Sequence, residues 1–292
     1  MKNFIAGIAF AILWASASVA TKMGLQSAQP FVLANIRFIS AGILLLIFAK
    51  ISGKNISFNK KEFKQLIIYG FLNVTLYLGA FVWALKHISA GIGSLATATN
   101  PLFIIVISSL FLGKKSSSNN WLGLVLGMTG VFIATYPLLK IAYADAFGLA
   151  LILGSMLSYS IGTIYYSEQN WQLNRLAING WQVLFGGIML LPITLFYFDF
   201  SANNFNTNFW LSSIWLIIPV SIGAVQLWLY LLSVDPIKAS TWLFLCPIFG
   251  FIYAYFLLNE PISCLTIAGT FLVMLGLYIG QTEKTIIPKK FR

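Results

Sequence analysis

The chain has 292 residues, of which 59% are hydrophobic and 9% are charged, and its mean hydropathy is +0.87. A soluble domain normally carries about a quarter charged residues and keeps a polar exterior, so the composition excludes a soluble globular fold. The formal net charge of +11 would indicate nucleic acid as the partner of a soluble chain. Here the placement of the basic residues explains the charge, so we expect a lipid bilayer and no nucleic acid.

Ten apolar segments follow one another along the chain. A membrane-spanning helix needs about 20 mostly apolar residues. The predicted spans are residues 3–23, 31–49, 65–85, 89–112, 121–139, 146–166, 176–198, 210–232, 238–258 and 263–281. The first is followed by many others, so it is interpreted as a helix and not as a cleavable signal peptide. Two longer linkers, 50–64 and 199–209, are lysine-rich and asparagine-rich respectively.

The distribution of lysine and arginine predicts the orientation. Basic residues concentrate in cytoplasmic loops of membrane proteins. With a cytoplasmic N-terminus, the outside loops hold Lys86 and Lys140, and nearly all other basic residues lie inside, including those of the C-terminal tail. The sequence therefore predicts a multi-pass protein of the plasma (inner) membrane with both termini in the cytoplasm.

A shift of 146 residues superimposes the two halves of the sequence. It places Pro101 on Pro247, Gly123 on Gly269 and Gly130 on Gly276. Each half holds five spans, an odd number, so the second half enters the membrane inverted. The prediction is an all-α protein of two inverted five-helix repeats, 1–140 and 141–292, the second ending in a basic cytoplasmic tail. Inverted repeats are typical of secondary transporters, whose site lies near the midplane between the repeats.

Five stretches carry a resemblance to a known family. They are WASASVATKMG (14–24), PFVLANIRF (30–38), SAGIGSLATATNPLFIIVISSLFLG (89–113), GLVLGMTGVFI (123–133) and ASTWLFLCPIFGFIYAYFLLNEPIS (239–263). In this order and at this spacing, the chain resembles the EamA-type members of the drug/metabolite transporter superfamily over almost its whole length. The resemblance implies export or exchange of a small metabolite, such as an amino acid-like or nucleotide-like compound.

Two positions depart from the family pattern. Lys114 stands where members often have a glutamate, so the motif is intact only in the second half, at Glu260. The first span also lacks the acidic residue that the related four-helix multidrug exporters use for proton exchange. Antiport of a cationic drug against protons is therefore not expected.

Ionisable residues inside a membrane are functional candidates, but the carboxylates of this chain lie at span ends, in loops or in cytoplasmic segments. No catalytic group, metal site or cofactor is predicted, and Cys246 and Cys264 have no metal or disulfide spacing. His87, at the outer end of the third span, is either a solvated loop residue or a gate residue that titrates near neutral pH.

Lys22 and Arg37 are predicted near the outer ends of the first two spans. They either extend to the interface between lipid and water or form a gate or outer mouth that attracts a carboxylate or phosphate.

Polar residues recur at helical spacing on two spans that the shift relates. Asn73 and Tyr77 lie on the third, and Gln226 and Tyr230 on the eighth. These faces serve either helix packing or a substrate cavity. The predicted substrate-binding set is Trp14, Ser18, Asn73, Tyr77, Thr97, Tyr159, Thr163, Gln226 and Tyr230. Pro101 and Pro247 are expected to kink the fourth and ninth spans.

The predicted function is transport of a small metabolite by alternating access. Two other classes stay open: an intramembrane enzyme and a channel-like facilitator or receptor. An enzyme needs a nucleophile with a base, or paired acids, at one depth, and the chain offers one histidine at a span end and no GxSxG motif. The inverted repeat disfavours a channel.

Overall fold

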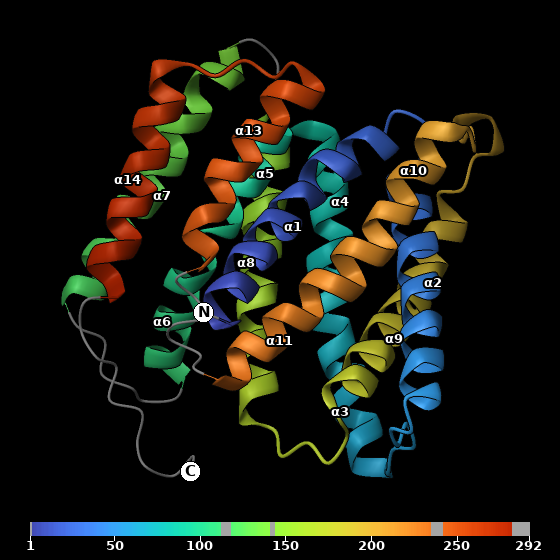
Figure 1. Cartoon of the computed structure of the whole chain (residues 1–292). Helices are drawn as coiled ribbons and strands as arrows, with labels where there is room; N and C mark the ends of the chain where they lie inside the picture. Colours follow the sequence, from blue (N-terminus) through green and yellow to red (C-terminus); the bar gives the residue numbers. More distant parts are fainter. Residues whose placement is uncertain (1, 112–117, 141–143, 235–241, 282–292) are drawn as a thin grey trace.

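The computed structural model describes residues 2–111, 118–140, 144–234 and 242–281, and these are helical almost throughout (Figure 1). The elements are α1 (Lys2–Gly24), α2 (Pro30–Ile51), α3 (Lys60–Gly70), η1 (Phe71–Leu76), α4 (Tyr77–His87), α5 (Ala90–Thr97), α6 (Asn100–Phe111), α7 (Ser118–Lys140), α8 (Ala146–Glu168), α9 (Arg175–Phe196), η2 (Phe200–Ala202), α10 (Thr207–Trp215), η3 (Leu216–Ala224), α11 (Val225–Val234), η4 (Trp242–Leu245), α13 (Cys246–Leu258) and α14 (Cys264–Gln281).

Over the described residues, these elements form ten helices, which confirms the predicted fold class. We number them one to ten: α1, α2, α3–η1–α4, α5–α6, α7, α8, α9, α10–η3–α11, η4–α13 and α14. Six are long and apolar enough to cross a membrane: helices one, two, three, six, seven and eight. Shorter apolar helices occur in helices five, nine and ten. Residues 112 and 238–241, parts of predicted spans, lie outside the described residues.

The third helix begins earlier than predicted. It starts at Lys60, within the linker that the sequence assigned to 50–64. Asn59 caps it, because its side chain accepts from the Glu62 backbone N–H while the Glu62 carboxylate accepts from the Asn59 N–H. This reciprocal pair satisfies free N–H groups of the first turn, so the lysine-rich segment becomes a helical extension beyond the apolar span.

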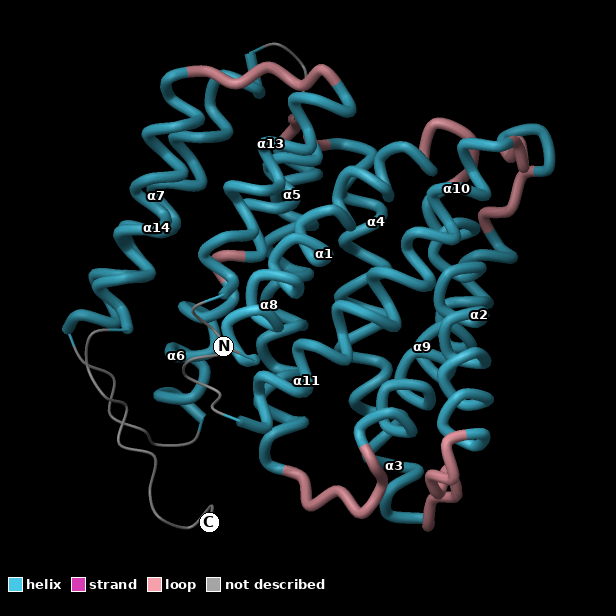
Figure 2. The backbone as a smooth tube through the Cα atoms, in the orientation of Figure 1, coloured by secondary structure: helices cyan, strands magenta, loops and turns pink. Residues whose placement is uncertain are grey.

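Contacts between helices follow a pseudo-twofold relation. Helix three packs on helix six as helix eight packs on helix one, and helices two and seven, four and nine, and five and ten pair with each other. The tube in Figure 2 shows α7 and α14 side by side, apart from the α2–α9 pair on the opposite flank. The main contacts between repeats are thus matched by their counterparts, as two equivalent inverted halves require.

Glycines of the repeat pattern lie where helices five and ten cross. A Cβ on Gly130 would be 2.6 Å from the Gly269 carbonyl oxygen, and one on Gly276 would be 2.7 Å from the Gly123 carbonyl oxygen. The 146-residue shift exchanges these two contacts, so the pairing is self-complementary. Small residues allow such close backbone approach in membranes.

The same irregularities occur in both repeats. Helix three has a π-helical segment at Phe71–Leu76, and helix eight has one at Leu216–Ala224, which contains the shifted positions 217–222. Helix four is interrupted before Asn100–Pro101, and helix nine passes from η4 into α13 at Cys246–Pro247. Proline has no N–H and clashes one turn back, which explains both interruptions. The Ser94 hydroxyl, one turn before the break of helix four, donates to the Cys246 carbonyl oxygen at the break of helix nine, at 3.0 Å.

The two ends of the bundle are distinct. The α1–α2, α4–α5, α9–α10 and α13–α14 connections lie at one end, which we call the Gln29 end, at the top of Figure 1. The α2–α3 and α8–α9 connections lie at the other, the Lys60 end. Large exposed apolar side chains, such as Ile47, Phe132 and Phe271, cover the flanks, as a surface in contact with lipid requires.

Candidate functional site

Three of the predicted substrate-binding residues form an aromatic group. The ring of Tyr159 on α8 lies 4.7 Å from that of Tyr77 on α4 and 6.4 Å from that of Trp14 on α1, measured between centroids. Tyr77 is the first residue after the π-helical segment η1. The group therefore joins helices one, three and six, on both sides of the repeat boundary.

A chain of hydrogen bonds crosses from helix three to helix eight. Asn73 donates to the Gln182 side-chain oxygen at 3.2 Å, Gln182 to the Asn179 oxygen at 3.0 Å, and Asn179 to the Ser221 carbonyl oxygen at 3.3 Å. Arg37 Nε donates to Ser221 Oγ at 2.9 Å. We call these five residues the polar chain. The polar chain thus runs from Asn73 in η1 to Ser221 in η3, the π-helical segments of the two repeats, and ends at Arg37 on α2.

Arg37 is not at an exposed mouth, as the sequence suggested. It lies about two turns inside α2, its side chain is 3% exposed, and its guanidinium carbon lies 5.5 Å from the centre of the Phe38 ring. Arg37 therefore neither extends to the interface between lipid and water nor lies on an outer rim. Inside the bundle, its guanidinium contacts Ser221, which belongs to the π-helical segment of helix eight.

Lys22 differs from Arg37. It lies in the last turn of α1, at the Gln29 end, and its ammonium donates to the Ile88 carbonyl oxygen. It also interacts electrostatically with Glu260. That carboxylate accepts from the N–H groups of Ala90 at 2.7 Å and Gly91 at 3.1 Å. Glu260 of the second repeat therefore caps α5 of the first.

The other predicted residues divide between the centre and the ends. Thr163 is one turn from Tyr159, although no hydrogen bond of standard geometry joins their hydroxyls. Thr97 is buried and donates back to the Ser94 carbonyl oxygen, beside the break of helix four. Tyr230 lies apart, because its hydroxyl donates to Asn3 at the N-terminal end of α1.

Ser18 and Gln226, two further residues of the predicted substrate-binding set, have buried polar atoms in their side chains. Ser18 is buried on α1, with its hydroxyl 3.5 Å from where a Cβ on Gly93 would be. The Gln226 side-chain nitrogen is buried and has no hydrogen-bond partner among the described residues. Asn73 Oδ1, Asn100 Oδ1 and the Tyr159 hydroxyl are likewise buried without a hydrogen-bond partner among the described residues. Unpaired buried polar atoms are costly and call for an explanation.

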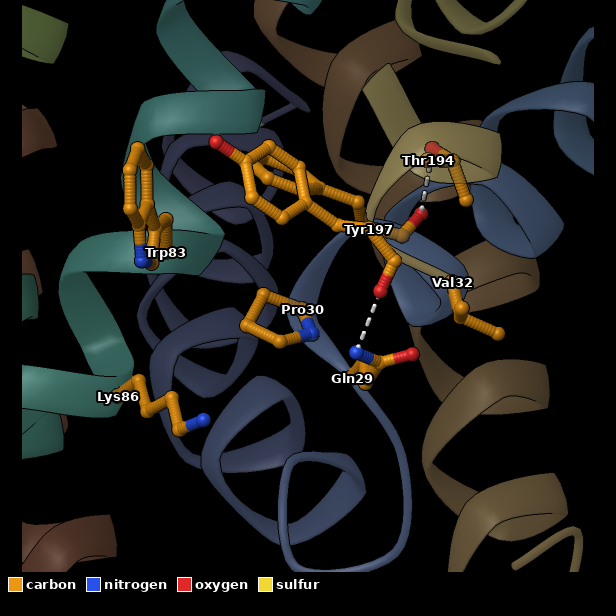
Figure 3. Close-up of a pocket in the computed structure, with 8 residues that line it drawn as sticks. Gln29, Pro30, Val32, Trp83, Lys86, Thr194 and Tyr197 are labelled. Carbon is orange, nitrogen blue, oxygen red and sulfur yellow. Dashed lines mark hydrogen bonds between the residues drawn. The ribbon is translucent and has the colours of Figure 1, made fainter. Parts of the chain in front are cut away.

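A pocket opens at the Gln29 end, between α2, α4 and α9. Its cavity volume is about 150 Å³, and it is lined by Gln29, Pro30, Phe31, Val32, Trp83, Lys86, Thr194 and Tyr197. Figure 3 shows Trp83 and Lys86 on one wall and Tyr197 and Gln29 facing them. Asn35 donates to Thr194 from behind this lining. The pocket is apolar with one lysine at its edge.

His87 is paired at the same end. Its Nδ1 lies 2.8 Å from the Asp145 carboxylate, which also accepts from the Gly148 N–H at 2.7 Å. The Gly148 hydrogen bond, followed by the one from His87, lowers the pKa of Asp145 below its usual value. Among the described residues, no group of three or more potential metal ligands exists.

Several residues of the site were not predicted. Asn179, Gln182 and Ser221 are almost completely buried and link Arg37 to Asn73. A signal existed, because Asn179 and Gln182 are polar residues three positions apart within an apolar span, which places them on one helix face.

Lys114, Asp235 and Glu283 lie outside the described residues.

The comparisons with known proteins agree with this architecture. A solved crystal structure superimposes on the chain with a TM-score of 0.69, covering 95% of this chain and 96% of the other at 14% identity, which shows a shared fold.

Among curated proteins, the chain is 26% identical over 286 residues to the uncharacterized transporter YoaV of Bacillus subtilis, covering 96% of this chain and 97% of that one. It is 28% identical over 290 residues to the uncharacterized transporter sll0355 of Synechocystis, covering 93% and 88%. It is 25% identical over 294 residues to the uncharacterized inner membrane transporter YedA of Escherichia coli, covering 98% and 94%.

The profile of the EamA-like transporter family matches the chain twice, over residues 1–136 and 146–280. Both halves of the fold are thus covered, as the inverted duplication requires. The chain belongs to the EamA-like transporter family and is a transporter, not an enzyme.

Proposed function

We propose that the protein is a secondary transporter that moves a small amphipathic metabolite across the inner membrane by alternating access, as an exporter or exchanger. In this proposal the Gln29 end faces outside and both termini are cytoplasmic. The observation that carries it is the position of the polar chain, which joins the matching π-helical segments of the two repeats.

The irregular helices support a moving mechanism. π-Helical turns occur mostly at functional sites, and each leaves the regular hydrogen-bond ladder of its helix. Helices three and eight carry these turns, and helices four and nine are interrupted where Ser94 meets Cys246. Each repeat therefore has two hinges at equivalent places, and one repeat rocks against the other around them.

The chemistry of the site supports an amphipathic solute. The Trp14–Tyr77–Tyr159 group offers apolar ring surface, and the unpartnered oxygens of Asn73 and Tyr159 offer hydrogen bonds. Sites for small molecules typically combine aromatic walls with a few polar groups that set orientation. The division of the chain near residue 140 stays a prediction, as does the whole assignment of substrate-binding residues.

Counterflow in proteoliposomes tests the proposal. Protein reconstituted with a metabolite mixture inside should take up labelled solute in a saturable way. Tyr159→Phe removes only the unpartnered hydroxyl, and should raise the KM by about 2- to 10-fold if that hydroxyl makes one hydrogen bond to substrate. Tyr255→Phe is the control, because Tyr255 is 50% exposed on α13.

Two results would contradict the proposal. Flux that does not saturate and shows no counterflow indicates a channel-like facilitator. Equal KM values for Tyr159→Phe and Tyr255→Phe indicate that the solute binds away from the aromatic group.

The orientation has its own test. Lys54 lies in the α2–α3 connection and Asn204 in the α9–α10 connection. Each is replaced by cysteine, as Lys54→Cys or Asn204→Cys, in a protein whose Cys246 and Cys264 have been replaced by serine. A membrane-impermeant maleimide applied to intact cells should label the second variant only. The opposite pattern places the N-terminus outside.

A further inference from the structure

Arg37 has no counter-charge in the described part of the chain. Among the described residues, no carboxylate oxygen lies within 4 Å of its guanidinium. The groups that contact it are neutral: the Ser221 hydroxyl and the Phe38 ring. The charge of Arg37 therefore lies inside an apolar bundle, in contact with uncharged groups.

The hydrogen-bonding capacity of Arg37 is mostly unused. A guanidinium has five N–H donors in a planar fork. The described residues accept from one of them, Nε, through Ser221. The side of the fork formed by Nη1 and Nη2 makes no hydrogen bond to those residues. That side is the one that matches two oxygens of a planar anion.

A buried charge without a partner costs several kcal/mol, and charged residues within membrane spans generally serve function. The polar chain orients Arg37 on one side. Ser221 Oγ accepts a hydrogen bond from Arg37 Nε, and the Asn179 side chain donates to the Ser221 carbonyl oxygen. An arginine that is oriented on one face and unpaired on the other has the form of a binding group.

The aromatic group gives the site its second component. Tyr77 lies on α4, which packs against α2, the helix of Arg37, and its ring lies 4.7 Å from that of Tyr159. A ligand bound to Arg37 therefore has ring surface beside it for an apolar portion. The geometry separates a charged end from an apolar end.

We propose that Arg37 binds the carboxylate of an amphipathic monocarboxylate substrate, whose apolar part packs against Tyr77 and Tyr159. This inference rests on the proposed transport function and specifies its substrate class. One guanidinium neutralises one carboxylate. A phosphate monoester carries about −1.5 to −2 charges at pH 7, so it would leave negative charge buried and fits less well.

Matched probes test the charge requirement without any variant. The purified full-length protein is mixed with millimolar hexanoate, phenylacetate or L-leucine, and with hexanamide, phenylacetamide or L-leucinamide, and thermal unfolding is followed. The carboxylates should raise the Tm and compete with one another in counterflow. The carboxamides, of equal shape but without the charge, should bind about 10- to 100-fold more weakly. Phenyl phosphate is the comparison for phosphate.

Variants of Arg37 locate the effect. Arg37→Gln should abolish the preference for carboxylate over carboxamide, and Arg37→Lys should keep a reduced preference because the charge remains and the fork is lost. Ser221→Ala is the matched control, since it removes the Nε hydrogen bond and leaves the charge. It should keep the preference for carboxylate. An unstable Arg37→Gln leaves the wild-type probe pairs and Arg37→Lys as readouts.

The outcomes separate this inference from the proposed function. Equal effects of carboxylates and carboxamides on the wild-type protein, or tighter binding of phenyl phosphate, overturn it. Counterflow of neutral or cationic solutes that is unchanged in Arg37→Gln also overturns the inference about Arg37. In that case the proposed transport function still stands. Absence of counterflow for every class of solute overturns the proposed function itself.

Discussion

The contact between Glu260 and α5 yields a quantitative prediction. Glu260 follows Asn259, whose left-handed backbone (φ 53°) ends α13 and turns the chain toward the first repeat. The carboxylate is 5% exposed, and each of its oxygens accepts from one backbone N–H, of Ala90 and of Gly91. The first N–H groups of a helix have no partner within that helix, so Glu260 supplies what α5 lacks.

Removing this carboxylate should be costly. A hydrogen bond to a charged group contributes about 1.5 to 3 kcal/mol. Glu260→Ala removes two of them and leaves two buried donors, so a loss of about 3 to 6 kcal/mol is expected if they act independently. Glu260→Gln retains one acceptor oxygen and should lose about half as much. Asp199→Asn is the control, because Asp199 also accepts from a helical turn but is exposed.

Thermal unfolding of the purified protein measures the effect, with the three variants compared in one detergent. Glu260→Ala should unfold at the lowest temperature, Glu260→Gln between it and wild type, and Asp199→Asn close to wild type. Equal shifts for Glu260→Ala and Asp199→Asn would show that the α5 contact contributes little. A larger loss in Glu260→Gln than in Glu260→Ala would refute the reasoning about acceptor oxygens.

Three further predictions rest on single contacts. Gly130→Val should prevent folding or greatly lower the Tm, because its Cβ would be 2.6 Å from a backbone oxygen of α14, whereas Gly154→Ala should not, since nothing lies within 4 Å there. Asn73→Ala should cost about 1 to 3 kcal/mol by leaving the Gln182 oxygen unpaired, which chemical unfolding measures against Asn204→Ala in a loop. The pKa of Asp145 is lowered on folding, so its contribution to stability is present above pH 4 and is lost as the pH falls further. The Tm difference between wild type and Asp145→Asn should therefore shrink as the pH falls below 4, and a difference that grows below pH 4 would contradict it.

The fold was predictable because hydropathy and repeat spacing are properties of the sequence itself. Apolar length defines a span, and glycines matched by the 146-residue shift pointed to a duplication. The structure adds a reason for those matches, since Gly130 and Gly276 occupy equivalent contacts between helices five and ten. The prolines at 101 and 247 were a similar signal. Because proline has no backbone N–H, it interrupts the hydrogen bonds of the helix that contains it, whatever that helix packs against.

The site was predictable only in part, because a sequence gives the position of a residue along a helix more readily than what its side chain faces. Arg37 was expected near a mouth from its distance to the start of α2, yet the side chain is enclosed by helix eight. Tyr230 was grouped with Gln226 by helical spacing, but its hydroxyl is bound at the end of α1.

The two repeats are symmetric in their backbone and asymmetric in their chemistry. The shift that pairs helix two with helix seven places Val183 opposite Arg37, so the cation occurs once. It pairs Ser221 with Thr75, whose hydroxyl donates to the Gly186 carbonyl oxygen instead of accepting from an arginine. A symmetric scaffold is what two equivalent hinges require, because opening one end and opening the other are then similar movements. A solute with one charged end has no such symmetry, and a site that matched the twofold would bind it in two opposing orientations. In the mechanism that we propose, the charge lies in one repeat, beside an aromatic wall shared by both, and selects one orientation of the solute, while the symmetric backbone allows both directions of movement.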